Sequence, residues 1–126
     1  GDWSSDVCSS DLYDGIPDDL ILGEGWYSVK INEERTFSFP GDAVWVRMTL
    51  AGREVTPDQS RPSRMCWVHG DRFRLQRHRT NPSILSFLHG PDLDQIYNWR
   101  EGNPPPAGWN FVRHFRHPAG RFQIRP

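Results

Sequence analysis

The sequence predicts a mainly β protein, an antiparallel β-sandwich or flattened barrel with one short helix near residues 91–100. Three observations support this fold class. Short apolar segments are separated by turn residues, residues 43–50 alternate strictly between two faces, and only one segment has helical spacing. The chain of 126 residues has the length of a single domain with one hydrophobic core.

The N-terminal segment differs from the rest of the chain. Residues 1–12, GDWSSDVCSSDL, resemble the translation of a short-read sequencing adapter at every position in order. The resemblance implies a leader foreign to the natural domain, which would then occupy residues 13–126 or be a fragment of a longer protein. We expect such a Ser- and Asp-rich leader to pack poorly. Without its three aspartates the formal net charge changes from −1 to +2.

The densest aromatic and β-branched content lies between residues 20 and 50. Strands are expected over 20–23, 26–31, 36–39 and 43–50. The apolar face of the last strand carries alternate residues: Val44, Val46, Met48 and Leu50. Ala51-Gly52 then supplies a tight turn, after which residues 53–56 can pair back.

Two further hairpins are expected downstream. Gly70-Asp71 provides a two-residue turn between strands at 65–69 and 72–79. A last hairpin around 118–120 joins residues 110–117 to 121–124. Between the two hairpins, the continuous apolar run at 83–88 predicts a buried strand.

The helical prediction depends on residues 91–100. Pro91 can occupy a first helical turn, and Leu93, Ile96 and Tyr97 recur at spacings of three and four residues. The Gly- and Pro-rich segment at 102–108 cannot continue this helix.

A second resemblance concerns the expected strands near the start of the domain. The segments LGEGWY at 22–27, RTFSF at 35–39 and DA at 42–43 resemble a strand pattern in small β-sandwich domains. These domains are found beside bacterial glycosyltransferases and methyltransferases of surface-polysaccharide synthesis. Phe39 stands where a Trp is usual, and Lys30 where an acid is common. The resemblance implies an accessory, non-catalytic role and supplies no functional residue.

Tryptophan side chains are the main candidates for ligand binding. Aromatic faces match the C–H faces of pyranose rings, while flanking Arg, Asp and Asn side chains satisfy hydroxyl groups. The candidate residues are Trp26, Trp45, Trp99 and Trp109. The sequence therefore predicts a non-catalytic accessory binding or interaction domain, with carbohydrate favoured as the ligand and a protein partner as another possibility. At least two of these tryptophans should then be exposed on one concave surface.

An arginine-rich face supports an alternative partner, nucleic acid. Fourteen of the 15 basic residues are Arg, and several alternate with aromatic residues, which is typical of single-strand nucleic-acid platforms. The residues of this face would be Arg72, Arg74, Arg77, Arg79, Arg113 and Arg116. Ordinary amphipathic strands with Arg on the solvent side explain the same pattern, and the small net charge disfavours this partner.

A third hypothesis is a small enzyme. His89, Asp92 and Asp94 lie at the predicted junction of a strand and the helix, where acid and base groups often act. Two acids there would equally favour a helix N-terminus. No nucleophile or phosphate-loop motif is present, so the sequence does not predict an enzyme.

No metal site and no cofactor are predicted. His114 and His117 would point to opposite faces of a strand. His69, Asp71 and His78 could approach one another across the Gly70-Asp71 hairpin, but such side chains usually face solvent.

Cysteine content and hydropathy indicate the environment of the chain. Once Cys8 is set aside with the leader, Cys66 is the remaining cysteine and is expected to be a small, reduced core residue. A single thiol favours the cytoplasm over an oxidising compartment. No apolar run is long enough to span a bilayer, so no membrane partner is predicted.

Overall fold

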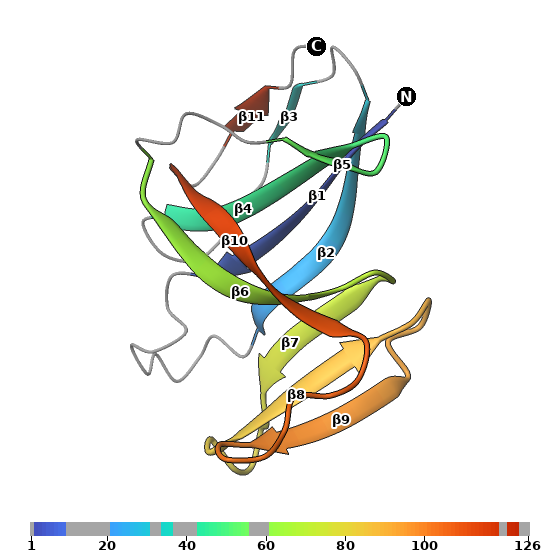
Figure 1. The fold of residues 1–126 in the computed structure, drawn as a ribbon, viewed down its shortest axis with the longest axis vertical. Helices are drawn as coiled ribbons and strands as arrows, with labels where there is room; N and C mark the ends of the chain where they lie inside the picture. The colour runs from blue at the N-terminus through green and yellow to red at the C-terminus, as the bar shows by residue number, and fades with distance from the viewer. Residues whose placement is uncertain are drawn as a thin grey trace.

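A computed structural model describes most of the chain, namely residues 2–9, 21–30, 34–36, 43–55, 61–118 and 121–123. These residues form strands and no helix (Figure 1). The strands are β1 (Asp2–Ser9), β2 (Ile21–Lys30), β3 (Glu34–Thr36), β4 (Ala43–Leu50), β5 (Arg53–Val55), β6 (Ser63–His69), β7 (Phe73–Arg77), β8 (Ile84–His89), β9 (Gln95–Arg100), β10 (Trp109–Pro118) and β11 (Arg121–Gln123).

The strands form two antiparallel sheets that do not close into a barrel, consistent with a β-sandwich. The larger sheet has the order β6-β10-β4-β1-β2-β7-β8-β9, with β5 paired to β4. The smaller sheet pairs β11 with β3. The predicted mainly β fold is therefore confirmed.

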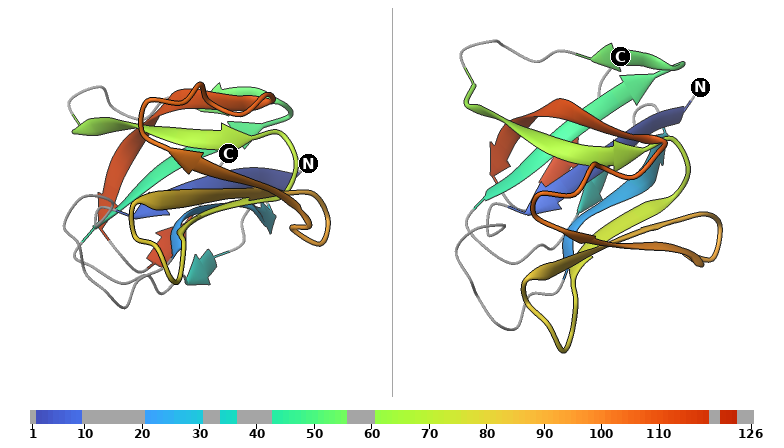
Figure 2. Two further views of the ribbon diagram at one scale, coloured as in Figure 1. Left: turned by 90° about the horizontal axis from the view of Figure 1, so that it is seen from below. Right: turned by 60° about the horizontal axis from the view of Figure 1, so that its bottom comes forward.

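The large sheet is strongly twisted, so that β6 and β10 lie across β2, β7 and β8 (Figure 2). Apolar side chains from both sides of this overlap form the main core. They are Leu22, Phe73, Leu75 and Phe87 from one side and Val68 and Trp109 from the other. Burial of this aromatic-rich set holds the two ends of the sheet together.

A second group of apolar residues lies on β2 and β4, the strands on either side of β1. Val44 and Val46 are buried with Met48 packed against them, and Met48 and Leu50 also pack against the buried Val29. The apolar face predicted for residues 43–50 is therefore the face that meets the core. The Ala51-Gly52 turn is also confirmed, because both residues have positive φ, as a type I′ hairpin requires, and β5 pairs back onto β4.

The predicted helix near residues 91–100 is wrong. Residues 91–94 form a turn in which Leu93 has a φ of 54°, and residues 95–100 form the edge strand β9, paired along its length with β8. Ile96 is 62% exposed, so the apolar spacing does not mark a buried helical face. Pairing with the free edge of β8 favours a strand over a helix here, because it satisfies main-chain hydrogen-bonding groups along the whole segment.

Both downstream hairpin predictions are also wrong. Strands β6 and β7 do not pair with each other: β6 pairs with β10, whereas β7 lies between β2 and β8. The Gly70-Asp71 segment therefore carries the chain from one side of the core to the other. Similarly, β10 pairs with β4 and β6, and β11 pairs with β3 in the smaller sheet. Ala119 and Gly120 of the last expected turn lie outside the described residues.

Strand β1 occupies the middle of the large sheet, between β2 and β4. The resemblance of residues 1–12 to a foreign leader predicted poor packing, but Asp2–Ser9 pair on both edges. Main-chain hydrogen bonds carry little sequence information, so a segment of almost any composition can occupy such a position. The expected strand at 36–39 lies mostly outside the described residues, which include only Thr36 of it.

Cys66 is buried, as expected, but it is disulfide-bonded and not a reduced thiol. The prediction of an unpaired cysteine was therefore wrong. The argument for the cytoplasm that relied on a single thiol no longer holds, because disulfides are typical of oxidising compartments.

Candidate functional site

A pocket of about 630 Å³ opens between the two sides of the core. Strands β6 and β10 form one wall, and β2, β7, β8 and β9 contribute to the other. The lining residues are Leu22, Gly23, Met65, Cys66, Trp67, Leu75, Arg77, Pro82, Ser83, Leu85, Trp99, Arg100, Glu101 and Phe111. This volume lies within the range of small-molecule sites, which is about 300–1,000 Å³.

Aromatic rings from opposite walls define the pocket. Trp67 and Phe111 occupy directly opposed positions on β6 and β10, and their ring centroids lie 4.8 Å apart. Phe111 is 47% exposed, so a large part of this aromatic surface is accessible. Trp99 on β9 lines the other wall. The buried Phe87 supports both walls, since its ring centroid lies 6.1 Å from that of Trp67 and 6.3 Å from that of Trp99.

Polar and charged groups accompany these rings. Arg77, Arg100 and Glu101 line the pocket, and the last two are exposed. The Trp99 indole N–H donates to the Asn103 carbonyl at 3.0 Å, which fixes the ring against the 101–103 turn. The pocket therefore combines aromatic faces with hydrogen-bonding groups of both charges.

The four tryptophans proposed from the sequence do not share one surface. Trp99 lines the pocket, whereas Trp109 is only 7% exposed and belongs to the core. Trp26 is partly buried against Phe73 in the core. Trp45 is partly buried and lies under the Arg64 guanidinium, 5.4 Å from the ring centroid.

Trp67 and Phe111 were not among the ligand-binding candidates proposed from the sequence. Their positions carried a usable signal, because Met65, Trp67 and His69 share one face of a strand by alternation, as do Trp109 and Phe111. What alternation could not show is that these two faces belong to neighbouring strands in register.

The six arginines of the alternative nucleic-acid face are also dispersed. Arg74 forms an ion pair with Glu24 at 3.4 Å, Arg77 lines the pocket, and Arg72 donates to the Pro91 carbonyl at 2.8 Å. Arg79, Arg113 and Arg116 are exposed; Arg79 follows β7, whereas Arg113 and Arg116 lie on β10.

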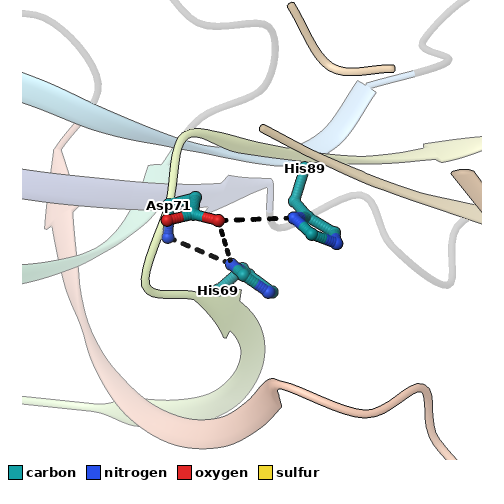
Figure 3. Close-up of side chains that lie close together, drawn as sticks. All are labelled: His69, Asp71 and His89. Atoms are coloured by element: carbon teal, nitrogen blue, oxygen red, sulfur yellow. Dashed lines mark hydrogen bonds and ion pairs between the residues drawn. The ribbon is translucent and has the colours of Figure 1, made fainter. Parts of the chain in front are cut away.

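A second group of polar residues lies at the end of the aromatic core opposite the pocket, beyond Phe87 and Trp109. His69 at the end of β6, Asp71 in the following connection and His89 at the end of β8 come together there (Figure 3). The imidazole rings of His69 and His89 are stacked, with centroids 3.9 Å apart and an interplanar angle of 13°. The Asp71 carboxylate lies 3.7 Å from His69 Nδ1 and 3.5 Å from His89 Nδ1.

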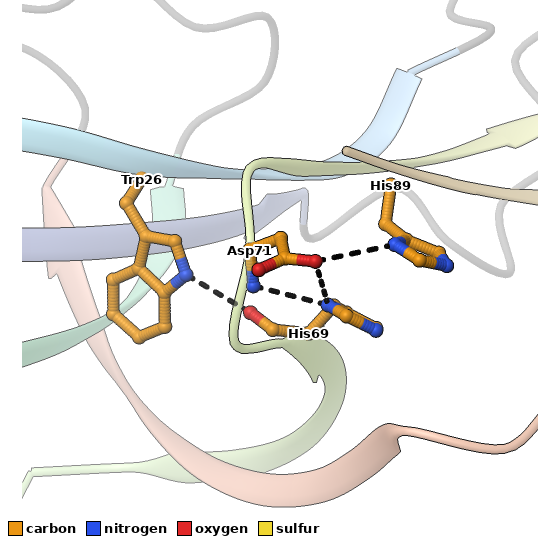
Figure 4. A network of polar contacts seen from close by, with 4 residues as sticks. All are labelled: Trp26, His69, Asp71 and His89. Carbon is orange, nitrogen blue, oxygen red and sulfur yellow. Dashed lines mark hydrogen bonds and ion pairs between the residues drawn. The ribbon is translucent and has the colours of Figure 1, made fainter. Parts of the chain in front are cut away.

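The main chain and its neighbours hold this group in place (Figure 4). The Trp26 indole N–H donates to the His69 carbonyl at 2.9 Å, and the Asp71 backbone N–H donates to His69 Nδ1 at 3.0 Å. Trp109 packs edge-on against both imidazoles, with its ring centroid 5.3 Å from that of His69 and 6.4 Å from that of His89. Burial, followed by the neighbouring His89, lowers the pKa of His69, although Asp71 opposes this shift.

His89 is the only member of the proposed enzyme site in this group. Asp92 and Asp94 are exposed in the turn that precedes β9. His78, expected to approach His69 and Asp71, instead lies 3.1 Å from the Thr80 hydroxyl. His114 is fully buried, with Nδ1 3.0 Å from the Val112 carbonyl. His117 lies at the end of β10, and its side chain is outside the described residues.

No protein family model matches the chain, and neither a curated protein nor a solved structure does. Among the described residues, no helix has the length and hydropathy required to cross a membrane. The residues that line the pocket and form the histidine pair therefore carry the argument for function.

Gly108 provides a test of how tightly His69 is held. At Gly108, where φ is +85°, an added Cβ would lie 3.0 Å from His69 Nε2; at Gly102, where φ is +93°, it would meet nothing within 4 Å. Both Gly→Ala changes incur a positive-φ penalty of roughly 1–2 kcal/mol. We expect Gly108→Ala to lower the free energy of unfolding, measured by urea denaturation, by about 1–3 kcal/mol more than Gly102→Ala does. The reason is that the added methyl group also displaces the His69 imidazole. Equal costs for the two variants would contradict the close packing of His69.

Proposed function

We propose that this protein is a non-catalytic accessory domain that binds carbohydrate in the pocket between β6, β10 and β9. The observation that carries the proposal is the placement of Trp67, Phe111 and Trp99 around one accessible cavity with charged groups beside them. Flat apolar rings suit the C–H faces of pyranoses, and a contiguous accessible apolar patch can mark a ligand-binding groove.

The charged residues support a hydroxylated ligand over a purely apolar one. Arg77 and Arg100 offer fixed N–H donors, and Glu101 offers an acceptor. Sugar hydroxyls can pair with both kinds of group, whereas an aliphatic ligand can pair with neither. The accessory role follows the resemblance of residues 22–43 to domains found beside enzymes of surface-polysaccharide synthesis.

A glycan array followed by calorimetric titration of the best-retained oligosaccharide would test the proposal. We expect Trp67→Ala and Trp99→Ala each to weaken binding about tenfold or more, because each removes a stacking surface worth roughly 1–2 kcal/mol. Trp45→Ala is the matched control, since it removes the same side chain away from the pocket. Its affinity should equal that of the unmodified protein, with folding of each variant verified by circular dichroism.

Two results would reject the proposal. One is the absence of any retained glycan on an array that includes bacterial surface polysaccharides. The other is an affinity that falls equally in folded Trp45→Ala and in the two folded pocket variants, because binding would then not depend specifically on the pocket.

A further inference from the structure

We infer that His69, Asp71 and His89 form a binding site for one divalent transition-metal ion of the zinc class. This inference does not rest on carbohydrate binding, because Phe87 and Trp109 separate the three residues from the pocket. The group is drawn from two segments, residues 69–71 and the end of β8, which meet only in the folded protein, as in Figure 3.

The donor set fits borderline metal ions. Two imidazoles and one carboxylate are common ligands of Zn²⁺, Co²⁺ and Ni²⁺, whereas Mg²⁺ and Ca²⁺ prefer sites made of oxygen atoms alone. With three protein ligands, such an ion retains an open coordination position for water or another small ligand.

The spacing of the donors also fits. Ligand atoms around a tetrahedral ion at 2.0–2.1 Å lie about 3.3 Å apart. Asp71 Oδ2 lies 3.7 Å from His69 Nδ1 and 3.5 Å from His89 Nδ1, and the three ligand atoms all fall within 4.8 Å of one another. Movements of a few tenths of an ångström would bring the carboxylate into coordination range. The stacked imidazoles would also have to turn out of their near-parallel arrangement, because each nitrogen lone pair lies in the plane of its ring.

The state of each donor is consistent with coordination. His89 Nδ1 is buried and makes no hydrogen bond within the part of the chain that the structure describes. His69 Nδ1 accepts the Asp71 backbone N–H, so an ion bound at this nitrogen would replace that hydrogen bond.

The surroundings restrict movement of the histidines. Trp26 holds the His69 main chain, Gly108 lies beside His69 Nε2, and Trp109 packs on both rings. Asp71 is 62% exposed, so an ion has direct access from solvent on the side of the carboxylate. The site therefore consists of two partly buried imidazoles held next to each other and one accessible carboxylate.

The test is calorimetric titration of the full-length, tag-free, EDTA-treated protein with ZnCl₂, together with visible absorption of the Co²⁺ complex. We expect one ion per chain and a Co²⁺ spectrum without a thiolate charge-transfer band, because the described residues include no free cysteine. His69→Gln, His89→Gln and Asp71→Asn should each weaken Zn²⁺ binding at least roughly tenfold. His78→Gln is the matched control and should leave the affinity unchanged.

Asp71→Asn keeps the inference falsifiable if a histidine variant fails to fold, because it is isosteric and alters an exposed side chain. Two results would overturn the inference. One is the absence of Zn²⁺ binding, and the other is binding of more than one ion that His78→Gln weakens as much as the three site variants do. Binding that requires both histidines but is unchanged in Asp71→Asn would overturn the three-ligand site. Nitrogen NMR of the imidazoles would identify which ring nitrogens shift with Zn²⁺.

Discussion

Deletion of residues 1–12 is expected to abolish the cooperative unfolding transition of this protein at 25 °C. Strand β1 pairs with both β2 and β4, so its loss leaves two backbone edges unpaired in the middle of the sheet. Each lost ladder hydrogen bond costs roughly 1 kcal/mol. Together they approach the stability of a whole domain, about 5–15 kcal/mol. Urea denaturation followed by Trp fluorescence and circular dichroism would measure the loss.

The control replaces residues 2–9 with an unrelated strand-forming segment of the same length. Both proteins would carry Cys66→Ser, so that the disulfide does not contribute to the difference. Because β1 is held by main-chain pairing, we expect the replacement to restore cooperative unfolding. An unchanged midpoint after deletion would contradict the central position of β1. Restoration only by the original sequence would instead count against the resemblance of this segment to a foreign leader.

Phe87→Ala is expected to lower the free energy of unfolding by about 3–5 kcal/mol, the usual cost of truncating a buried aromatic residue. Phe87 is 2% exposed and contacts the rings of Trp67, Trp99 and Trp109. Its removal leaves a cavity that three large side chains cannot fill without leaving their preferred positions. Urea denaturation monitored by circular dichroism would give the difference.

Ile96→Ala serves as the control for this prediction, since Ile96 is an apolar residue that is 62% exposed on the neighbouring edge strand. We expect it to change the free energy of unfolding by less than about 0.5 kcal/mol.

The two sites respond differently to Phe87→Ala. The pocket loses the support of both its aromatic walls, whereas the histidine pair retains its contacts with Trp109. A cost for Phe87→Ala close to that of Ile96→Ala would contradict the assignment of Phe87 to the core.

The candidate sites lie in the same layer of side chains. Trp67, Trp109 and His69 come from one face of the β6–β10 pair, and Phe87 and His89 come from one face of β8. Ring contacts run from Trp67 through Phe87 and Trp109 to His69. Carbohydrate binding and metal binding are therefore proposed for opposite ends of one aromatic core, and each can be tested without the other.

Local patterns were sufficient where a segment interacts mainly with its immediate neighbours in sequence. The alternation of Val44 and Val46 identified the buried face of β4, and Ala51-Gly52 identified its turn into β5. The same reasoning failed at Ile96, where helical spacing was present but the open edge of β8 formed a strand. Local preferences are weak compared with the pairing of a whole strand edge.

The sequence by itself determined the fold class, the apolar face of β4 and the presence of tryptophans suited to ring ligands. Only the tertiary structure decided which residues form a site. The Gly70-Asp71 segment crosses the core, which brings Asp71 and His69 to His89 and places Trp67 opposite Trp99. The physical reason is that side-chain alternation specifies which face of a strand is buried, whereas strand order depends on long-range pairing that no local pattern encodes.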